Sequence, residues 1–166
     1  NKLMAELGLM KESAEKLIAQ YHSKAPFIKQ LMKNTTNKAE RSGIIRTLKG
    51  RICHFDMWEP LTFNTGTPKK LEDAQKEYTF GIKRAFTYRA LNRLIQGSAA
   101  DMTKMSLIHL HENGIVPHIQ IHDEVDISVE SPEHASKIIE IMESAVKLEI
   151  PNKVDYESGN NWGDIK

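Results

Sequence analysis

The tripeptide His122-Asp123-Glu124 places an imidazole and two carboxylates in the middle of an apolar, alternating segment, residues 116–129. Such alternation is typical of a half-buried strand with its odd positions on one face. Those positions are Ile119, Ile121, Val125, Ile127 and Val129, and Asp123 interrupts them. Because an unpaired buried carboxylate is costly, we predict a hairpin that bends at His122 to Glu124 and exposes both acids.

Two adjacent acids on an exposed bend can hold a hard divalent cation through their oxygen atoms. The alternative is an acidic turn that is simply solvated, which is the commoner origin of an isolated tripeptide of this kind. Asp126, two residues further on, is better explained as a solvated strand residue. The neighbouring segments must therefore decide between a metal site and a plain turn.

Residues 88–105 have the periodicity of a long amphipathic helix. Its apolar side consists of Leu91, Leu94, Ile95, Ala99, Met102 and Met105. Its other side consists of Arg89, Asn92, Arg93, Gln96, Ala100 and Thr103. This second side contains amide and cationic donors but no acid, whereas a solvated face usually mixes both charges.

Such donors can bind a DNA duplex without reading its sequence. Every base pair presents an N3 or O2 acceptor in the minor groove, and the amides of Asn92 and Gln96 are donors suited to such acceptors. The alternative is an ordinary surface helix with no ligand.

The predicted elements alternate between helices and short strands. Helices are expected at 2–7, 11–22, 26–41 and 132–148, a hairpin at 44–48 and 51–55, a long helical region at 69–113 with a break at Gly81, and a last strand at 154–156. Ser131 is the natural N-cap of the helix at 132–148, and Pro132 suits its first position. This order predicts an α+β fold, an antiparallel sheet with helices packed on one face.

The net charge of +1 over 166 residues conceals two oppositely charged halves. Residues 1–104 carry 19 Lys and Arg against 10 Asp and Glu, whereas residues 105–166 carry 4 against 12. Eight bases lie between residues 24 and 51, which favours a phosphate-facing surface over a merely solvated one. They are Lys24, Lys29, Lys33, Lys38, Arg41, Arg46, Lys49 and Arg51.

Cysteine content and hydropathy restrict the class of protein further. The single Cys53 excludes an internal disulfide and is best explained as a small, partly buried thiol. No apolar run reaches membrane-spanning length and no signal-peptide core begins the chain, so we expect a soluble intracellular protein without a membrane partner.

Three strings together resemble the family A DNA polymerases, which include bacterial DNA polymerase I and many bacteriophage enzymes. They are Ala-Leu-Asn-Arg-Leu-Ile-Gln-Gly-Ser-Ala-Ala-Asp at 90–101, Gln-Ile-His-Asp-Glu-Val at 120–125 and Gly-Asn-Asn-Trp at 159–162. Their order and spacing match the family too, and the first string is more similar to the phage branch. The resemblance extends from about Leu3 to Trp162 and includes the Leu48-Lys49-Gly50-Arg51 turn.

The resemblance implies a C-terminal portion of a polymerase, with a helical rear-fingers segment at 1–43 and a palm segment at 44–166. It implies nucleotidyl transfer from a dNTP to a primer 3′-OH by a two-metal mechanism. Asp123, and with less support Glu124, would be the catalytic and metal-binding carboxylates for two Mg²⁺ ions. The remaining implied residues contact DNA: Arg89, Asn92, Arg93 and Gln96 from the helix, and His122 near the primer end.

The family's second carboxylate and its nucleotide-gripping fingers helix are not identified in this sequence. The resemblance therefore implies an upstream polymerase segment or subunit as a partner, besides primer-template DNA and dNTP, and a chain that is inactive alone. It implies the cytoplasm of a bacterial host, or a prophage gene, as the source.

The sequence departs from the family at the start of the helix. Many members have an Arg four residues before the Asn, but here Tyr88 has that position and Arg89 lies three before Asn92.

Two other functions stay open: a catalytically silent DNA-binding or assembly module, and a metal-dependent nuclease built on Asp123, Glu124 and Asp126.

Overall fold

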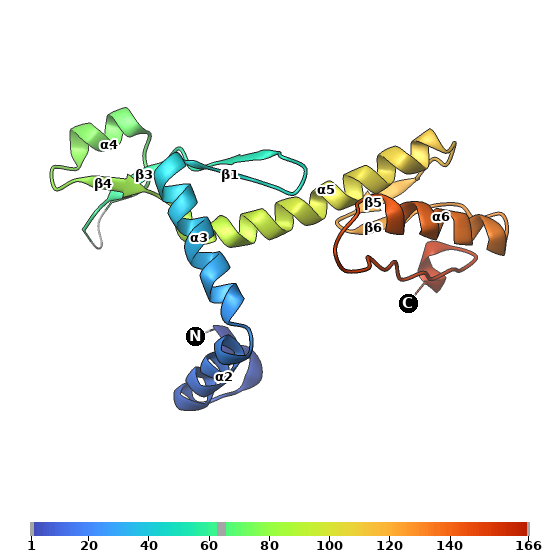
Figure 1. Ribbon diagram of the computed structural model, residues 1–166, viewed down its shortest axis with the longest axis horizontal. Coiled ribbons are helices and arrows are strands. Elements are labelled where there is room, and N and C mark those ends of the chain that lie inside the picture. The colour runs from blue at the N-terminus through green and yellow to red at the C-terminus, as the bar shows by residue number, and fades with distance from the viewer. Residues whose placement is uncertain (1, 63–65, 166) are drawn as a thin grey trace. The chain divides into compact units, whose positions relative to one another are not determined.

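The computed structural model describes residues 2–62 and 66–165 (Figure 1). The elements in chain order are α1 (Lys2–Leu7), α2 (Lys11–Lys24), α3 (Pro26–Ser42), β1 (Ile44–Arg46), β2 (Ile52–His54), β3 (Trp58–Pro60), α4 (Leu71–Glu77), β4 (Ile82–Arg84), the 3₁₀ helix η1 (Thr87–Arg89), α5 (Ala90–Glu112), β5 (Ile119–Ile121), β6 (Glu124–Asp126), α6 (Pro132–Ser144) and the 3₁₀ helix η2 (Trp162–Asp164). The α+β class predicted from the sequence is confirmed.

The strands of the described residues pair in three separate two-stranded antiparallel sheets, β1-β2, β3-β4 and β5-β6, and not in the single sheet that we expected. Two of these strands were not predicted at all. β4 lies inside the segment that was expected to be helical, and it pairs with β3, which begins at Trp58. Periodicity within a few residues cannot reveal this pairing, because the partner strand is distant in the sequence.

The chain packs as two compact units. The first consists of Asn1–Arg46 and Arg51–Leu94, and the second of Thr47–Gly50 and Ile95–Lys166. The expected division into rear fingers, 1–43, and palm, 44–166, concerns the organisation of a complete polymerase and stays a prediction.

The core of the first unit brings α3, the β1-β2 hairpin and the start of α5 together. It consists of Ala39, Ile45, Phe55 and Ala90, with Cys53 and Leu94 packed against it. α3 ends at Ser42, and the left-handed backbone of the following Gly43 lets the chain turn directly into β1. Cys53 is half-buried, as expected for a thiol on a short strand.

The core of the second unit lies between α5, α6 and the β5-β6 hairpin (Figure 1). Its buried residues are Leu110, Ile115 and Ile138, and Val125, Ile127, Ile141 and Met142 pack against them. α6 begins as predicted, because the Ser131 hydroxyl accepts a hydrogen bond from the His134 amide at 3.2 Å and Pro132 occupies the first turn.

The segment after α6 is fastened to that helix and does not form the strand expected at 154–156. The Glu143 carboxylate accepts hydrogen bonds from Lys153 Nζ at 3.0 Å and from the Val154 amide at 3.1 Å. The Lys153 ammonium and then the Val154 N–H hold the pKa of Glu143 below its usual value. The Val154 amide is thus satisfied by a side chain instead of a neighbouring strand.

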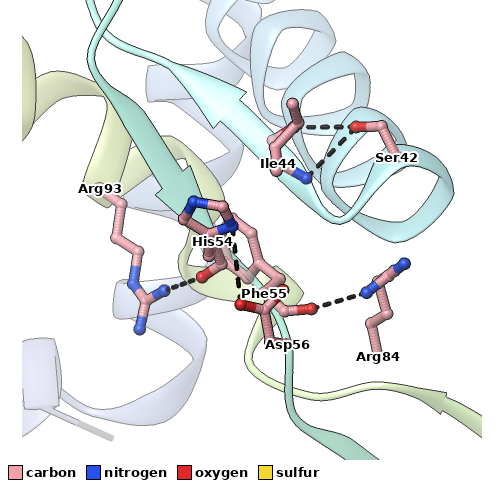
Figure 2. Close-up of polar contacts among 7 residues, drawn as sticks. All are labelled: Ser42, Ile44, His54, Phe55, Asp56, Arg84 and Arg93. Atoms are coloured by element: carbon pink, nitrogen blue, oxygen red, sulfur yellow. Dashed lines mark hydrogen bonds and ion pairs between the residues drawn. The ribbon is translucent and has the colours of Figure 1, made fainter. Parts of the chain in front are cut away.

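Arg84 of β4 is held by a backbone carbonyl just before β3 (Figure 2) and by one aromatic ring of β3. Its Nη1 donates to the Phe55 carbonyl at 2.9 Å, and its guanidinium lies 4.5 Å from the centre of the Trp58 ring. Gly43 borders the same guanidinium so closely that a Cβ at this position would lie 2.6 Å from the Arg84 Cζ. Only glycine leaves this space free.

We expect Gly43→Ala to lower the free energy of unfolding by about 2–4 kcal/mol, because alanine is strained at φ 71° and also displaces Arg84. Gly114→Ala is the matched control: its φ is 74°, but a Cβ there meets nothing within 4 Å. This control should lose only about 1–2 kcal/mol. Equal losses in chemical denaturation would show that the contact with Arg84 is unimportant.

Candidate functional site

The β5-β6 hairpin turns through only two residues, His122 and Asp123, as the bend predicted from the sequence requires. Ile121 pairs with Glu124 across the turn, and Ile119 pairs with Asp126. The φ of His122 is 54°, a left-handed conformation that few non-glycine residues adopt, although histidine is among the more tolerant. The turn is fixed by one side-chain contact, since the amide of Gln120 donates to the His122 carbonyl.

The pairing overturns the prediction that the odd positions share one face. A two-residue turn pairs odd positions of β5 with even positions of β6, so Ile119 and Ile121 lie on the face of Asp126 and Glu124. Val125 lies on the opposite face, towards the core. Ile119 and Ile121 are accordingly 43% and 37% exposed.

The acids on the turn are open to solvent. Asp123 and Glu124 are both exposed, and neither carboxylate has a hydrogen-bond or ion-pair partner within residues 2–62 and 66–165. In that same part of the chain, no group of three or more His, Cys, Asp and Glu side chains could hold a metal ion. A nuclease site built on Asp123, Glu124 and Asp126 alone is therefore not favoured.

The helix predicted at 88–105 is α5, a helix of 23 residues that begins at Ala90. Asn92 and Gln96 lie one turn apart, and both side chains are exposed. Neither amide has a hydrogen-bond partner among the described residues, so both keep their donors available. The predicted apolar side is less uniform than expected, since Ile95 is also exposed whereas Leu94 packs on the first core.

The two arginines near the start of α5 have partners within the first unit. Arg93 Nη1 donates to the His54 carbonyl at 3.0 Å, and its guanidinium lies 4.9 Å from the Phe55 ring centre (Figure 2). Arg89 belongs to η1, where its Nε donates to the Tyr88 hydroxyl at 2.9 Å. Tyr88 and Arg89 thus form a pair at this end of the helix.

Two further residues of α5 escaped the sequence analysis as functional candidates. The Ser98 hydroxyl accepts a hydrogen bond from the Leu48 amide at 3.0 Å, and the buried Asp101 carboxylate accepts one from the Lys49 amide at 3.3 Å. These contacts fasten the turn between β1 and β2 to the helix. The available signal was the spacing of Ser98 and Asp101, which lie three residues apart and therefore on the same side of the helix.

The predicted site residues fall into both units. His122, Asp123 and Glu124 lie together at the hairpin turn, and Gln96 belongs to the same unit. Arg89, Asn92 and Arg93 belong to the first unit. All eight bases of the run from Lys24 to Arg51 have exposed side chains, as a phosphate-facing surface requires.

We expect Arg93→Ala to lower the stability of the first unit by about 1–3 kcal/mol, because it removes a charged hydrogen bond and a contact with an aromatic ring. Gln96→Ala, an exposed residue of the same helix, should change stability by less than about 0.5 kcal/mol. Thermal and urea unfolding of both variants test this expectation. A stable Arg93→Ala variant would show that the guanidinium is available to another ligand.

Comparison of the sequence with known proteins identifies the family. The family model for DNA polymerase family A matches residues 1–164. A DNA-directed DNA polymerase of Pseudomonas phage M6 is 37% identical over 166 residues, which cover 98% of this chain and 22% of the relative. DNA polymerase I of Geobacillus stearothermophilus is 31% identical over 174 residues, covering 99% of this chain and 18% of the relative.

A similar fold occurs in the POL domain of Pol1 from M. smegmatis, solved in complex with DNA primer-template and dNTP. The TM-score is 0.64 at 23% identity, over 90% of this chain and 25% of that one. The matched segments of the two polymerases cited above are 22% and 18% of their lengths, so this chain spans only about a fifth of these relatives. Since the family model matches nearly every residue, the chain belongs to DNA polymerase family A.

Proposed function

We propose that this chain is the palm-containing part of a template-directed DNA polymerase, which transfers a nucleotide from a dNTP to a primer 3′-OH. The observation that carries the proposal is the hairpin turn, where Asp123 and then Glu124 present exposed carboxylates without an internal partner. These two acids also stand within the string at 120–125 that resembles the family. A turn that is acidic only because it is solvated would not need to match that string.

The carboxylates suit Mg²⁺, a hard cation that prefers oxygen ligands. Asp123 would be the principal ligand and Glu124 a weaker one, and the two-residue turn keeps both at the exposed tip of a short hairpin. When bound, Mg²⁺ would stabilise the charge on the attacking and leaving oxygens of a phosphoryl transfer.

Two acids on one turn are too few for a two-metal centre, and the described residues contain no cluster of three ligands. We infer that a second carboxylate comes from another segment of the polymerase, which would also grip the incoming nucleotide. This segment, primer-template DNA and dNTP are the proposed partners, and the cytoplasm of a bacterial host is the proposed location. No helix in the described ranges has the length and apolar character that a membrane crossing requires.

The open amides of Asn92 and Gln96 would donate to the minor-groove acceptors that all correct base pairs share. His122, exposed on the turn beside Asp123, would approach the primer end. Arg89 and Arg93 already make contacts within the chain. A contact with DNA would either replace these or be added to them. The exposed bases from Lys24 to Arg51 would supply the phosphate contacts that strengthen binding at low salt.

We expect Asp123→Asn to abolish primer extension by a polymerase that contains this chain, while duplex binding stays close to wild type. A lost metal ligand raises the chemical barrier more than it weakens DNA contact. Asp126→Asn, on the same hairpin, is the control and should retain activity. The 166 residues alone should not extend a primer.

Substantial Mg²⁺-dependent turnover by Asp123→Asn would contradict the assignment. DNA binding by the wild-type chain with no extension in any polymerase context would instead favour a catalytically silent binding module.

We expect Gln96→Ala to reduce extension efficiency roughly fivefold, and to the same degree for all four template bases, because one neutral hydrogen bond contributes on the order of 1 kcal/mol. Lys29→Ala, if it removes only a phosphate contact, should weaken binding in a salt-dependent way with no effect on mismatch discrimination. Extension from matched and mismatched primer ends at two salt concentrations separates these effects. Wild-type behaviour of Gln96→Ala would identify α5 as an ordinary surface helix here.

A further inference from the structure

We propose that Gln120 is a positioning residue for Asp123, because its side chain holds the peptide group that joins His122 to Asp123. This inference rests on the proposed function, in which Asp123 is a metal-binding carboxylate. Gln120 itself would contact neither metal nor substrate. Its role would be to fix the direction in which the Asp123 side chain leaves the turn.

The geometry follows from a single hydrogen bond. Gln120 Nε2 donates to the carbonyl oxygen of His122, two residues further along the same chain. Since a carbonyl oxygen only accepts, the donor must be the amide nitrogen of Gln120. This carbonyl and the backbone nitrogen of Asp123 belong to one planar peptide group, so a bond that orients the carbonyl also orients the start of Asp123.

The turn needs such a bond because little else defines it. His122 adopts a φ of 54° without being glycine, and a side chain in this region is strained. His122 and Asp123 are both exposed, so side-chain packing does not restrain them. The flanking strands pair over only three residues each. The Gln120 amide would therefore hold the His122–Asp123 peptide group in place, although a rotation of this group could relieve the strain at His122.

A second side-chain contact closes the opposite end of the same hairpin. His118 Nε2 lies 2.9 Å from the Ser128 hydroxyl, beyond the last strand pair. This contact supports the hairpin but does not reach the turn. It therefore provides a matched control, since its loss affects the same small sheet at the end away from Asp123.

The test compares Gln120→Met, which keeps the length of the side chain but has no donor, with Ser128→Ala. The first readout needs no activity: NMR of the folded chain measures the backbone couplings of His122 and the orientation of the Asp123 N–H bond. Gln120→Met should change both quantities and leave the shifts of the Leu110 and Ile138 core in place. Ser128→Ala should leave the turn unchanged.

The second readout uses a polymerase that contains this chain. Gln120→Met should raise the Mg²⁺ concentration for half-maximal extension roughly tenfold and lower kcat, as the loss of a residue that orients a metal ligand commonly does. The KM for primer-template DNA should not change. A residue that merely stabilises the fold would alter neither the Mg²⁺ dependence nor the balance of kcat against KM.

The outcomes separate this inference from the proposed function. If Asp123→Asn abolishes extension but Gln120→Met shows a wild-type turn and Mg²⁺ dependence, the positioning role is wrong and the proposed function stands. If Asp123→Asn retains full activity, the proposed function fails, whatever the NMR of Gln120→Met shows. An equal effect of Ser128→Ala on Mg²⁺ dependence would also overturn the specific role of Gln120.

Discussion

Both hydrophobic cores depend on one continuous element, helix α5. Ala90 and Leu94, near its start, belong to the first core, and Leu110, near its end, belongs to the second. Because a helix satisfies its interior backbone hydrogen bonds within itself, 23 residues can serve two units without a break. Because the core residues lie near the two ends of α5, the middle of the helix carries polar side chains, among them Gln96, Ser98 and Asp101.

The polar residues of α5 fall into two groups according to what satisfies them. Arg93, Ser98 and Asp101 bind backbone groups of the β1-β2 region, so they stabilise the chain's own fold. Asn92 and Gln96 keep exposed amides. Charge alone would rank the arginines as the foremost DNA ligands, but Arg89 and Arg93 each donate one N–H to an internal acceptor, whereas the exposed amides of Asn92 and Gln96 have no such partner. The neutral amides are therefore the better candidates for base-pair contacts.

At the β5-β6 hairpin the number of residues in the turn decides which side chains share a face. The two-residue turn sets which residues face the core, and it leaves Asp123 at the exposed tip. The same turn places Ile119 and Ile121 on the acidic face, at moderate exposure. In the role that we propose for Asp123, the direction of its carboxylate must be fixed, and the contact that we propose for this purpose is the hydrogen bond from the Gln120 amide to the His122 carbonyl.

The sequence by itself determined the family, the α+β class, the long helix, the capped start of α6 and the bend at His122, because caps, turns and periodicity are local signals. It also identified the exposed acids as candidates. The pairing of β3 with β4, the reversal of faces across the hairpin and the internal partners of Arg84 and Arg93 became visible only in the tertiary structure. Each of these depends on groups that are distant in sequence or on the exact number of residues in a turn, and no local pattern specifies either.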